Sequence, residues 1–350
     1  MASGELQRIL HLPGGMRAVD DLSERIGLFH SAEKILGGFP RPPYASLYSQ
    51  LAALGLSTIG VEFVHHSAVK RRVPPDWQCA SPRGEFRVHV ERCHWSEIRH
   101  AARGDRNPHI SRVASFSQTY LDLLNLRLFQ LSDAYNQTLA GSYRPENNLD
   151  HLQSTIIMQS IDAAVHAFLA DAGSLRDLIA LIVWRFILHR DESVRTLGSF
   201  IKKARDSDHP IAIEIIAQAG SAGWLKQLST LRDEVIHIAP MGSQQHFHSF
   251  KIRAKEIAPT VTLFALHYPI LTADGSIWTE EEVIGTDRVS MIAALLRYND
   301  FVETSMDGLD YCWRTFDSLV ELLARIREEC GFRSEQLIIG AEDIFEVKLL

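Results

Sequence analysis

The chain is poor in cysteine, with four in 350 residues and no Cys-x-x-Cys pair. Cysteines this few and this widely spaced argue against a disulfide framework, and they predict free thiols in the reducing cytoplasm. The one zinc site that the cysteines suggest combines Cys79, Cys93 and His94, but no fourth ligand stands at zinc-finger spacing. We therefore predict no bound metal.

Long apolar runs are missing as well. The most apolar run, residues 178–184, is bounded by Asp177 and Arg185 and is far too short to cross a bilayer. It indicates the centre of a buried helix instead. The first twenty residues contain no apolar segment typical of a secretory signal, so the sequence predicts no association with a membrane.

The chain also lacks the usual signatures of nucleotide binding and of common hydrolases. It has no glycine-rich phosphate loop, no Gly-x-Ser-x-Gly turn and no His-Glu-x-x-His helix, and we predict no cofactor. The net charge of −7 argues against an extended nucleic-acid-binding surface, so an anionic ligand would meet a local basic cluster. The cluster Lys202, Lys203 and Arg205 is a weak candidate for substrate binding.

The sequence pattern changes near residue 109 and again near residue 240. Before residue 109 it is mixed, with a helix predicted at 44–54 and strands at 58–64 and 86–90. Glycine and proline at 103–108 indicate a boundary. We predict a mixed α+β region at 1–109 that senses a signal or delivers substrate.

Residues 110–240 carry apolar residues at helical spacing, which predicts a bundle of four or more helices. The first is a long helix with Leu121, Leu124, Leu128 and Leu131 on its core side. The later helices are expected over 156–168, 175–188, 192–205, 210–218 and 221–239, with a kink or cap at Gly173-Ser174.

Residues 241–350 predict a β-hairpin and a long helix that pack on this bundle. The strand-like run 261–270 precedes an Asp-Gly turn at 273–276 and then Ile277-Trp278. Helical texture follows over 289–329, and strands are expected at 337–339 and 344–349. The fold class is therefore mainly α with smaller β elements, α+β.

The helix predicted at 221–239 carries one specific chemical signal, the segment Arg232-Asp233-Glu234-Val235-Ile236-His237. At about 100° per residue, its apolar side chains fall in one arc that predicts the core face; they are Trp224, Leu228, Leu231, Val235 and Ile238. Asp233 and His237 lie on nearly the opposite side, with Arg232 at the flank. We expect the Asp/His pair to face water, a ligand or a second subunit.

These three groups suit chemistry on a phosphodiester. An arginine binds phosphate oxygens through two N–H groups and stays charged, and a histidine titrates near neutrality and can transfer a proton. His237 is then the proton-transfer group, Arg232 the phosphate and transition-state contact, and Asp233 the orienting residue. Attack by a ribose 2′-hydroxyl would leave a cyclic phosphate and a 5′-hydroxyl without a metal.

The segment resembles the Arg-x4–6-His motif of the HEPN superfamily, whose members include many ribonucleases of toxin, antiphage and CRISPR systems. Family members commonly carry a polar residue after the arginine, where Asp233 stands here, and the motif closes a late helix of a bundle. The run 163–184 is similar in texture to the core helices that pack against the motif helix. The resemblance covers about residues 110–240.

This resemblance implies a HEPN-like bundle at 110–240 and a metal-independent endoribonuclease that cuts RNA in prokaryotic antiphage or toxin–antitoxin defence. It also implies a homodimer formed through the Arg232–His237 helix, with a regulatory partner protein as a further expectation. HEPN toxins controlled by an adenylylating partner often have a tyrosine two residues after the histidine. Ala239 stands there, so that control is not predicted.

Other interpretations remain open. The bare Arg-to-His spacing also occurs at Arg25–His30 and, one residue longer, at 83–89. The alternative interpretation of 232–237 is that Arg232 and His237 are ordinary surface residues of an amphipathic helix, with Asp233 pairing locally with His237. His246 and His248 suit a substrate contact, or a metal pair that lacks a third ligand. The alternative function is a catalytically inactive HEPN-like module that binds a nucleotide, RNA or a partner protein.

Overall fold

The computed structural model describes most of the chain. The described residues are 6–20, 24–29, 36–65, 76–142, 152–153, 158–221, 223–235, 249–258, 261–278 and 287–332. Within them helices predominate and strands form smaller sheets, which confirms the mainly helical α+β fold. No helix in these ranges is long and apolar enough to cross a membrane.

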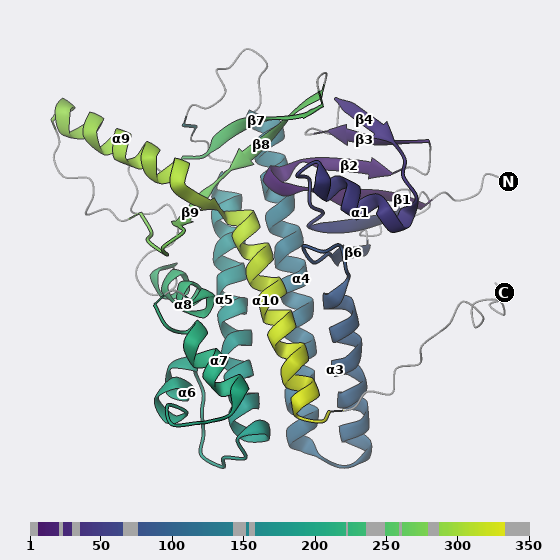
Figure 1. The fold of residues 1–350 in the computed structure, drawn as a ribbon, viewed down its shortest axis with the longest axis vertical. Helices are drawn as coiled ribbons and strands as arrows, with labels where there is room; N and C mark the ends of the chain where they lie inside the picture. The colour runs from purple at the N-terminus through teal and green to yellow at the C-terminus, as the bar shows by residue number, and fades with distance from the viewer. Residues whose placement is uncertain are drawn as a thin grey trace.

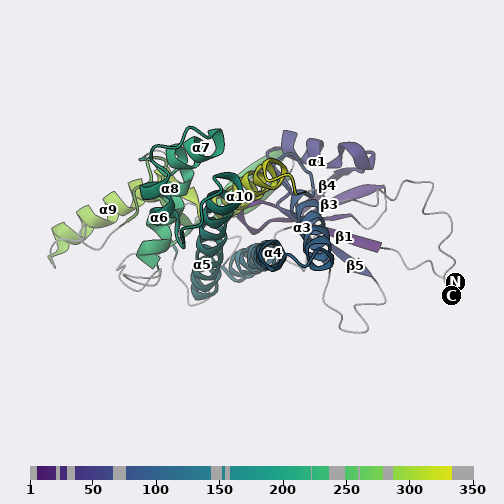
Figure 2. The same ribbon diagram turned by 90° about the horizontal axis from the view of Figure 1, so that it is seen from below.

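Four long helices surround one hydrophobic core (Figures 1 and 2). They are α3 (Arg87–Gly104), α4 (Pro108–Ser142), α5 (Met158–Ile182) and α10 (Gly308–Glu329). The four leucines of α4 that the spacing predicts to face the core, at 121, 124, 128 and 131, are fully buried. Apolar residues three and four apart share one helix face, and burial of that face holds the bundle together.

Helix α5 runs without interruption through Gly173 and continues into a π-helical turn at Val183–Ile187. Gly173 is therefore neither a kink nor a cap. Three short helices follow in the predicted order and lie on one side of α5 (Figure 1). They are α6 (Leu197–Lys203), α7 (Pro210–Gln218) and α8 (Trp224–Asp233).

An antiparallel six-stranded sheet lies at one end of the bundle, with strand order β4-β3-β2-β1-β5-β6 (Figure 1). Its strands are β1 (Leu6–His11), β2 (Arg17–Asp20), β3 (Arg25–Phe29), β4 (Gly37–Pro40), β5 (Gly60–His65) and β6 (Asp76–Cys79). Helix α1 (Tyr44–Ala53) packs Leu47 and Leu51 against this sheet. The helix predicted at 44–54 and the strand predicted at 58–64 are confirmed.

The strand predicted at 86–90 is wrong, because Arg87 begins α3. Alternation over three apolar residues is too short to distinguish a period of 2 from the first turns of a helix. The buried positions Val88, Trp95 and Ile98 show the helical period instead. Residues 103–108 form the turn by which α3 enters α4.

The hairpin predicted from 261–270 and Ile277-Trp278 is wrong, and a different hairpin forms in this region. Strand β8 (Val261–His267) pairs with β7 (Lys251–Ala258), which precedes it in the chain. Strand β9 (Pro269–Thr272) pairs with β10 (Ser305–Asp307), and Ile277-Trp278 is not a strand. The Asp-Gly turn does form, with Gly275 at φ +86°, but it closes on Thr272 and leads away from the sheet.

The helix predicted over 289–329 is two helices, α9 (Arg288–Thr304) and α10, separated by β10. Helix α9 projects from the body of the molecule (Figure 1). Its first turns leave Val289 and Leu296 77% and 61% exposed. The strands expected at 337–339 and 344–349 lie outside the described residues.

A polar link joins α4 to the start of α10. The Asp307 carboxylate accepts hydrogen bonds from the Tyr135 hydroxyl at 3.1 Å and from the Tyr268 amide at 3.0 Å. Its other oxygen caps α10 by accepting from the amides of Leu309 and Asp310. Burial outweighs these bonds and raises the pKa of Asp307 to about 7.

This pKa predicts a pH-dependent stability. A carboxyl whose pKa is higher in the folded than in the unfolded chain contributes stability at acid pH that is lost as pH rises toward 7. Since 17% of the Asp307 side chain reaches solvent, we expect the group to lower the free energy of unfolding by about 1–2 kcal/mol between pH 5 and pH 8. Asp307→Asn, which keeps an acceptor for the cap, should remove this slope in urea titrations. Equal slopes in both proteins would contradict the assignment.

Candidate functional site

Helix α8 forms because its apolar residues recur at helical spacing and face α5. Leu225, Leu228, Leu231 and Val235 are buried, whereas Trp224 is only partly buried. The helix begins after Gly223, which provides no side-chain cap. The core face predicted from the helical wheel is thus confirmed for Leu228, Leu231 and Val235.

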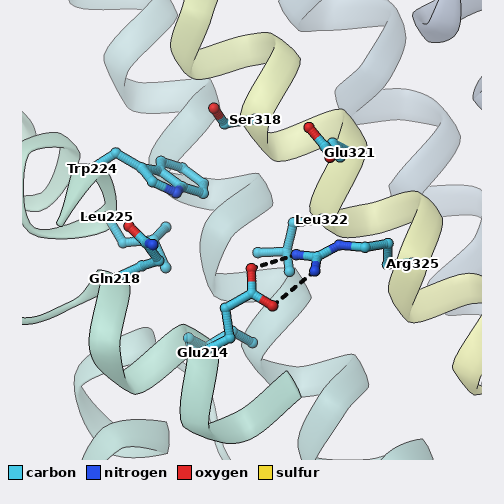
Figure 3. Close-up of a pocket in the computed structure, with 9 residues that line it drawn as sticks. Glu214, Gln218, Trp224, Leu225, Ser318, Glu321, Leu322 and Arg325 are labelled. Carbon is cyan, nitrogen blue, oxygen red and sulfur yellow. Dashed lines mark hydrogen bonds and ion pairs between the residues drawn. The ribbon is translucent and has the colours of Figure 1, made fainter. Parts of the chain in front are cut away.

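A salt bridge beside the first turn of α8 ties this layer to the bundle. Figure 3 shows the Glu214 carboxylate of α7 facing the Arg325 guanidinium of α10, with Trp224 at the other side of a pocket of about 170 Å³. Both oxygens of Glu214 accept from Arg325. Two-point pairing of this kind fixes orientation as well as distance. The salt bridge therefore fastens α7, the helix before α8, to α10.

Arg232 and Asp233 lie in the last turn of α8. An Arg232 terminal nitrogen, Nη1, donates to Asp233 Oδ1 at 3.2 Å. The Asp233 side chain is 61% exposed, as the helical wheel predicts, while that of Arg232 is only 25% exposed. Residues 236–248 lie outside the described residues, so His237, His246 and His248 have no described position.

The stem of Arg232 lies against Gly173 in the middle of α5. A β-carbon built on Gly173 would stand 2.3 Å from Cδ and 2.6 Å from Nε of Arg232. Any other residue at position 173 would therefore collide with the arginine. The Arg232 Nε atom is shielded from solvent and has no hydrogen-bond partner among the described residues. This placement holds the guanidinium at the junction of α5 and α8 with donor capacity to spare.

A second arginine at the same junction has no counterpart in the sequence prediction. Arg176, buried on α5, donates to Ser229 of α8 at 2.8 Å and to Asp177 at 2.9 Å. The same Asp177 oxygen accepts from the amide of Leu197 at the start of α6. The buried charge is thereby compensated, and α5, α6 and α8 are joined. The only signal in the sequence is the Arg-Asp pair inside an apolar helix.

The basic cluster Lys202, Lys203 and Arg205 is not brought to Arg232. It lies at and just beyond the end of α6. The Lys203 ammonium donates to Glu192 at 2.7 Å. Lys203 is therefore paired within its own loop, and among the described residues no hydrogen bond or ion pair links the cluster to Arg232.

A buried His-Ser-Glu cluster resembles a catalytic nucleophile with its base, but its burial gives it a structural role. His11 of β1 lies 3.0 Å from the Ser132 hydroxyl of α4 and contacts Glu62 of β5 through its other ring nitrogen. Both His11 and Ser132 are fully buried, and burial, aided by Arg17, lowers the pKa of His11 well below its usual value. A substrate cannot reach this serine, so the cluster fastens the sheet to the bundle.

The charged groups of the α5–α8 junction define what the candidate site can do. An arginine whose stem packs on α5, beside an exposed carboxylate, suits an anion with several acceptor oxygens, such as a phosphodiester, which its terminal nitrogens could bind. Among the described residues, no three His, Cys, Asp or Glu side chains are grouped to hold a metal ion. Comparisons of the chain with protein-family models, with curated proteins and with solved structures find no match.

Proposed function

We propose that this chain is a metal-independent endoribonuclease of HEPN type that acts in prokaryotic antiphage or toxin–antitoxin defence. The observation that supports it best is the placement of Arg232, whose stem packs on Gly173 and whose guanidinium lies next to the exposed Asp233. An arginine held in this way has little freedom to lose when it binds a phosphate.

In this proposal each group of the motif has one role. Arg232 binds the scissile phosphate and stabilises the charge that builds up on its oxygens. Asp233 holds the guanidinium by its 3.2 Å hydrogen bond and keeps it pointed at the exposed edge of α8. His237 assists proton transfer as the ribose 2′-hydroxyl attacks. Two copies of the chain would meet through their Arg232–His237 helices, so the site would be composite.

A cleavage assay tests the proposal. Purified protein incubated with mixed-sequence RNA in EDTA should produce fragments with 5′-hydroxyl and cyclic phosphate ends. His237→Ala should produce none, and cutting should rise more steeply than linearly with protein concentration if a dimer is required. A strict need for a divalent cation would contradict the metal-independent mechanism.

A second candidate is a catalytically inactive module that binds RNA, a nucleotide or a partner protein. The low exposure of the Arg232 side chain, 25%, favours it, because a packed stem also suits a structural arginine. Under this alternative, wild-type protein binds RNA without cutting it, and Arg232→Ala lowers stability rather than activity.

A further inference from the structure

A groove of about 500 Å³ lies between α4, the end of α5 and the segment that leads into α6. Its volume falls in the range of ligand-binding sites. Along α4 it extends from His109 to Tyr120, a span of roughly 16 Å at 1.5 Å per residue. It is therefore long enough for an extended ligand and not only for a compact one.

The charge of this groove is unbalanced. Arg112, Arg185 and Arg195 come from its three walls, all are exposed, and none forms an ion pair with a carboxylate of the described residues. The one carboxylate in the lining, Asp177, is already engaged with Arg176 and with the amide of Leu197. In a chain of net charge −7, three guanidinium groups around one groove, with no ion pair among the described residues, indicate an anionic ligand.

Aromatic rings accompany these charges. Phe116 is 42% exposed, and the Arg112 guanidinium carbon lies 5.3 Å from the centre of its ring. Tyr120 and Phe186, both half-buried, line the groove as well. Flat rings interleaved with cations suit a ligand with stacked bases and a phosphate backbone, because bases stack on rings and phosphates pair with arginines.

The groove also lies next to the candidate site. Ser174 and Asp177 form part of its wall, and they follow Gly173, on which Arg232 packs. The same stretch of α5 therefore separates the groove from the arginine. A strand lying along the groove would reach the part of α5 that adjoins Gly173.

We propose that this groove binds a single-stranded segment of RNA, with Phe116 stacking on a base and Arg112, Arg185 and Arg195 contacting phosphates. The choice of RNA rests on the proposed function; the nucleotide chemistry rests on the groove itself. The groove would thus hold the strand on one side of the stretch of α5 on which Arg232 packs.

Binding is measured by fluorescence anisotropy with a labelled 12-nucleotide RNA whose 2′-positions are all methylated, so that it cannot be cut. Phe116→Leu should weaken binding about tenfold, as loss of one stacked base does. Arg195→Ala should flatten the slope of log affinity against log salt by roughly 0.7, the value for one phosphate contact on a single strand. Leu126→Ala, an exposed apolar change elsewhere on α4, and Arg288→Ala, a charge change on α9, are the matched controls and should leave both quantities unchanged.

Three results would overturn the proposal. They are unchanged affinity in Phe116→Leu and Arg195→Ala, equal binding of a duplex of the same length, and binding of AMP without binding of the oligonucleotide. The ribonuclease proposal can fail separately. If the methylated probe binds through the groove but natural RNA is not cut, the groove proposal stands and the ribonuclease proposal is wrong. If RNA is cut and the groove variants cut it at the wild-type rate, the ribonuclease proposal stands and the groove proposal is wrong.

Discussion

Arg232→Ala is expected to lower the rate of RNA cleavage at least a hundredfold, the usual loss when one fixed donor to a developing oxyanion is removed. The alanine also leaves Asp233 without its 3.2 Å partner. Arg232→Lys should fall nearly as far, because an ammonium retains the charge but not the planar pair of donors. Initial rates on a fluorogenic RNA, measured in EDTA, give both values.

The control for Arg232→Ala is Lys226→Ala on the same helix. Lys226 is exposed and lies two turns earlier, so its loss changes the charge of α8 equally without touching the junction. Cleavage should be unchanged, and both variants should retain the circular dichroism of the wild type. If the Arg232→Ala protein cuts RNA at the wild-type rate, Arg232 has no part in the proposed mechanism.

Gly173→Ala is expected to lower cleavage at least tenfold while leaving the protein at least as stable. The new methyl group would stand 2.3 Å from Cδ of Arg232, so the arginine must leave its place on α5. Alanine is nevertheless the better helix former, by about 1 kcal/mol in a helix interior. Gly173 lies inside a 25-residue helix, and the atoms in the way belong to a flexible arginine side chain that can move aside, so this gain should at least match the steric cost. Activity and thermal stability should therefore change in different directions.

Gly198→Ala provides the matched control, because a β-carbon at Gly198 of α6 meets nothing within 4 Å. It should raise stability without altering cleavage. The double variant Gly173→Ala with Arg232→Ala completes a cycle: once the arginine is gone, the methyl group should cost no further activity. Additive losses would show that Gly173 acts through another residue.

The helices were predictable because each buries one face. Spacing alone placed Leu121 and Leu128 of α4 in the core, and it placed Asp233 of α8 outside. The strands β1 to β4 were not predicted, since they are short and partly glycine-rich and lack a clear alternation. The apolar residues from Phe86 to Val90 fit both the two-residue period of a strand and the period of a helix, and only the packing of α3 shows that the segment is helical.

The candidate site was predictable only within its own helix. The pattern at 232–237 gives the chemical groups, but no periodicity says that α8 packs on α5 or that Gly173 receives the arginine. The partnership of Arg176 with Ser229 is likewise a contact between segments 53 residues apart. The groove combines residues near 109–120, 174–186 and 193–195, which only the bundle brings together.

Helix α10 has a consequence for the order of events during protein synthesis. It is the last helix described along the chain, yet it packs on α3, α4 and α5, and the Trp313 indole donates to the carbonyl oxygen of Ala80 at 2.6 Å. A nascent chain that ends before Gly308 therefore has Arg232 but not the helix that closes the core beneath it. At ordinary elongation rates, roughly 5 to 20 seconds pass between the addition of Val235 and that of Glu329. During that interval the ribosome carries an incomplete bundle, so a site that depends on the closed core forms only after α10 emerges.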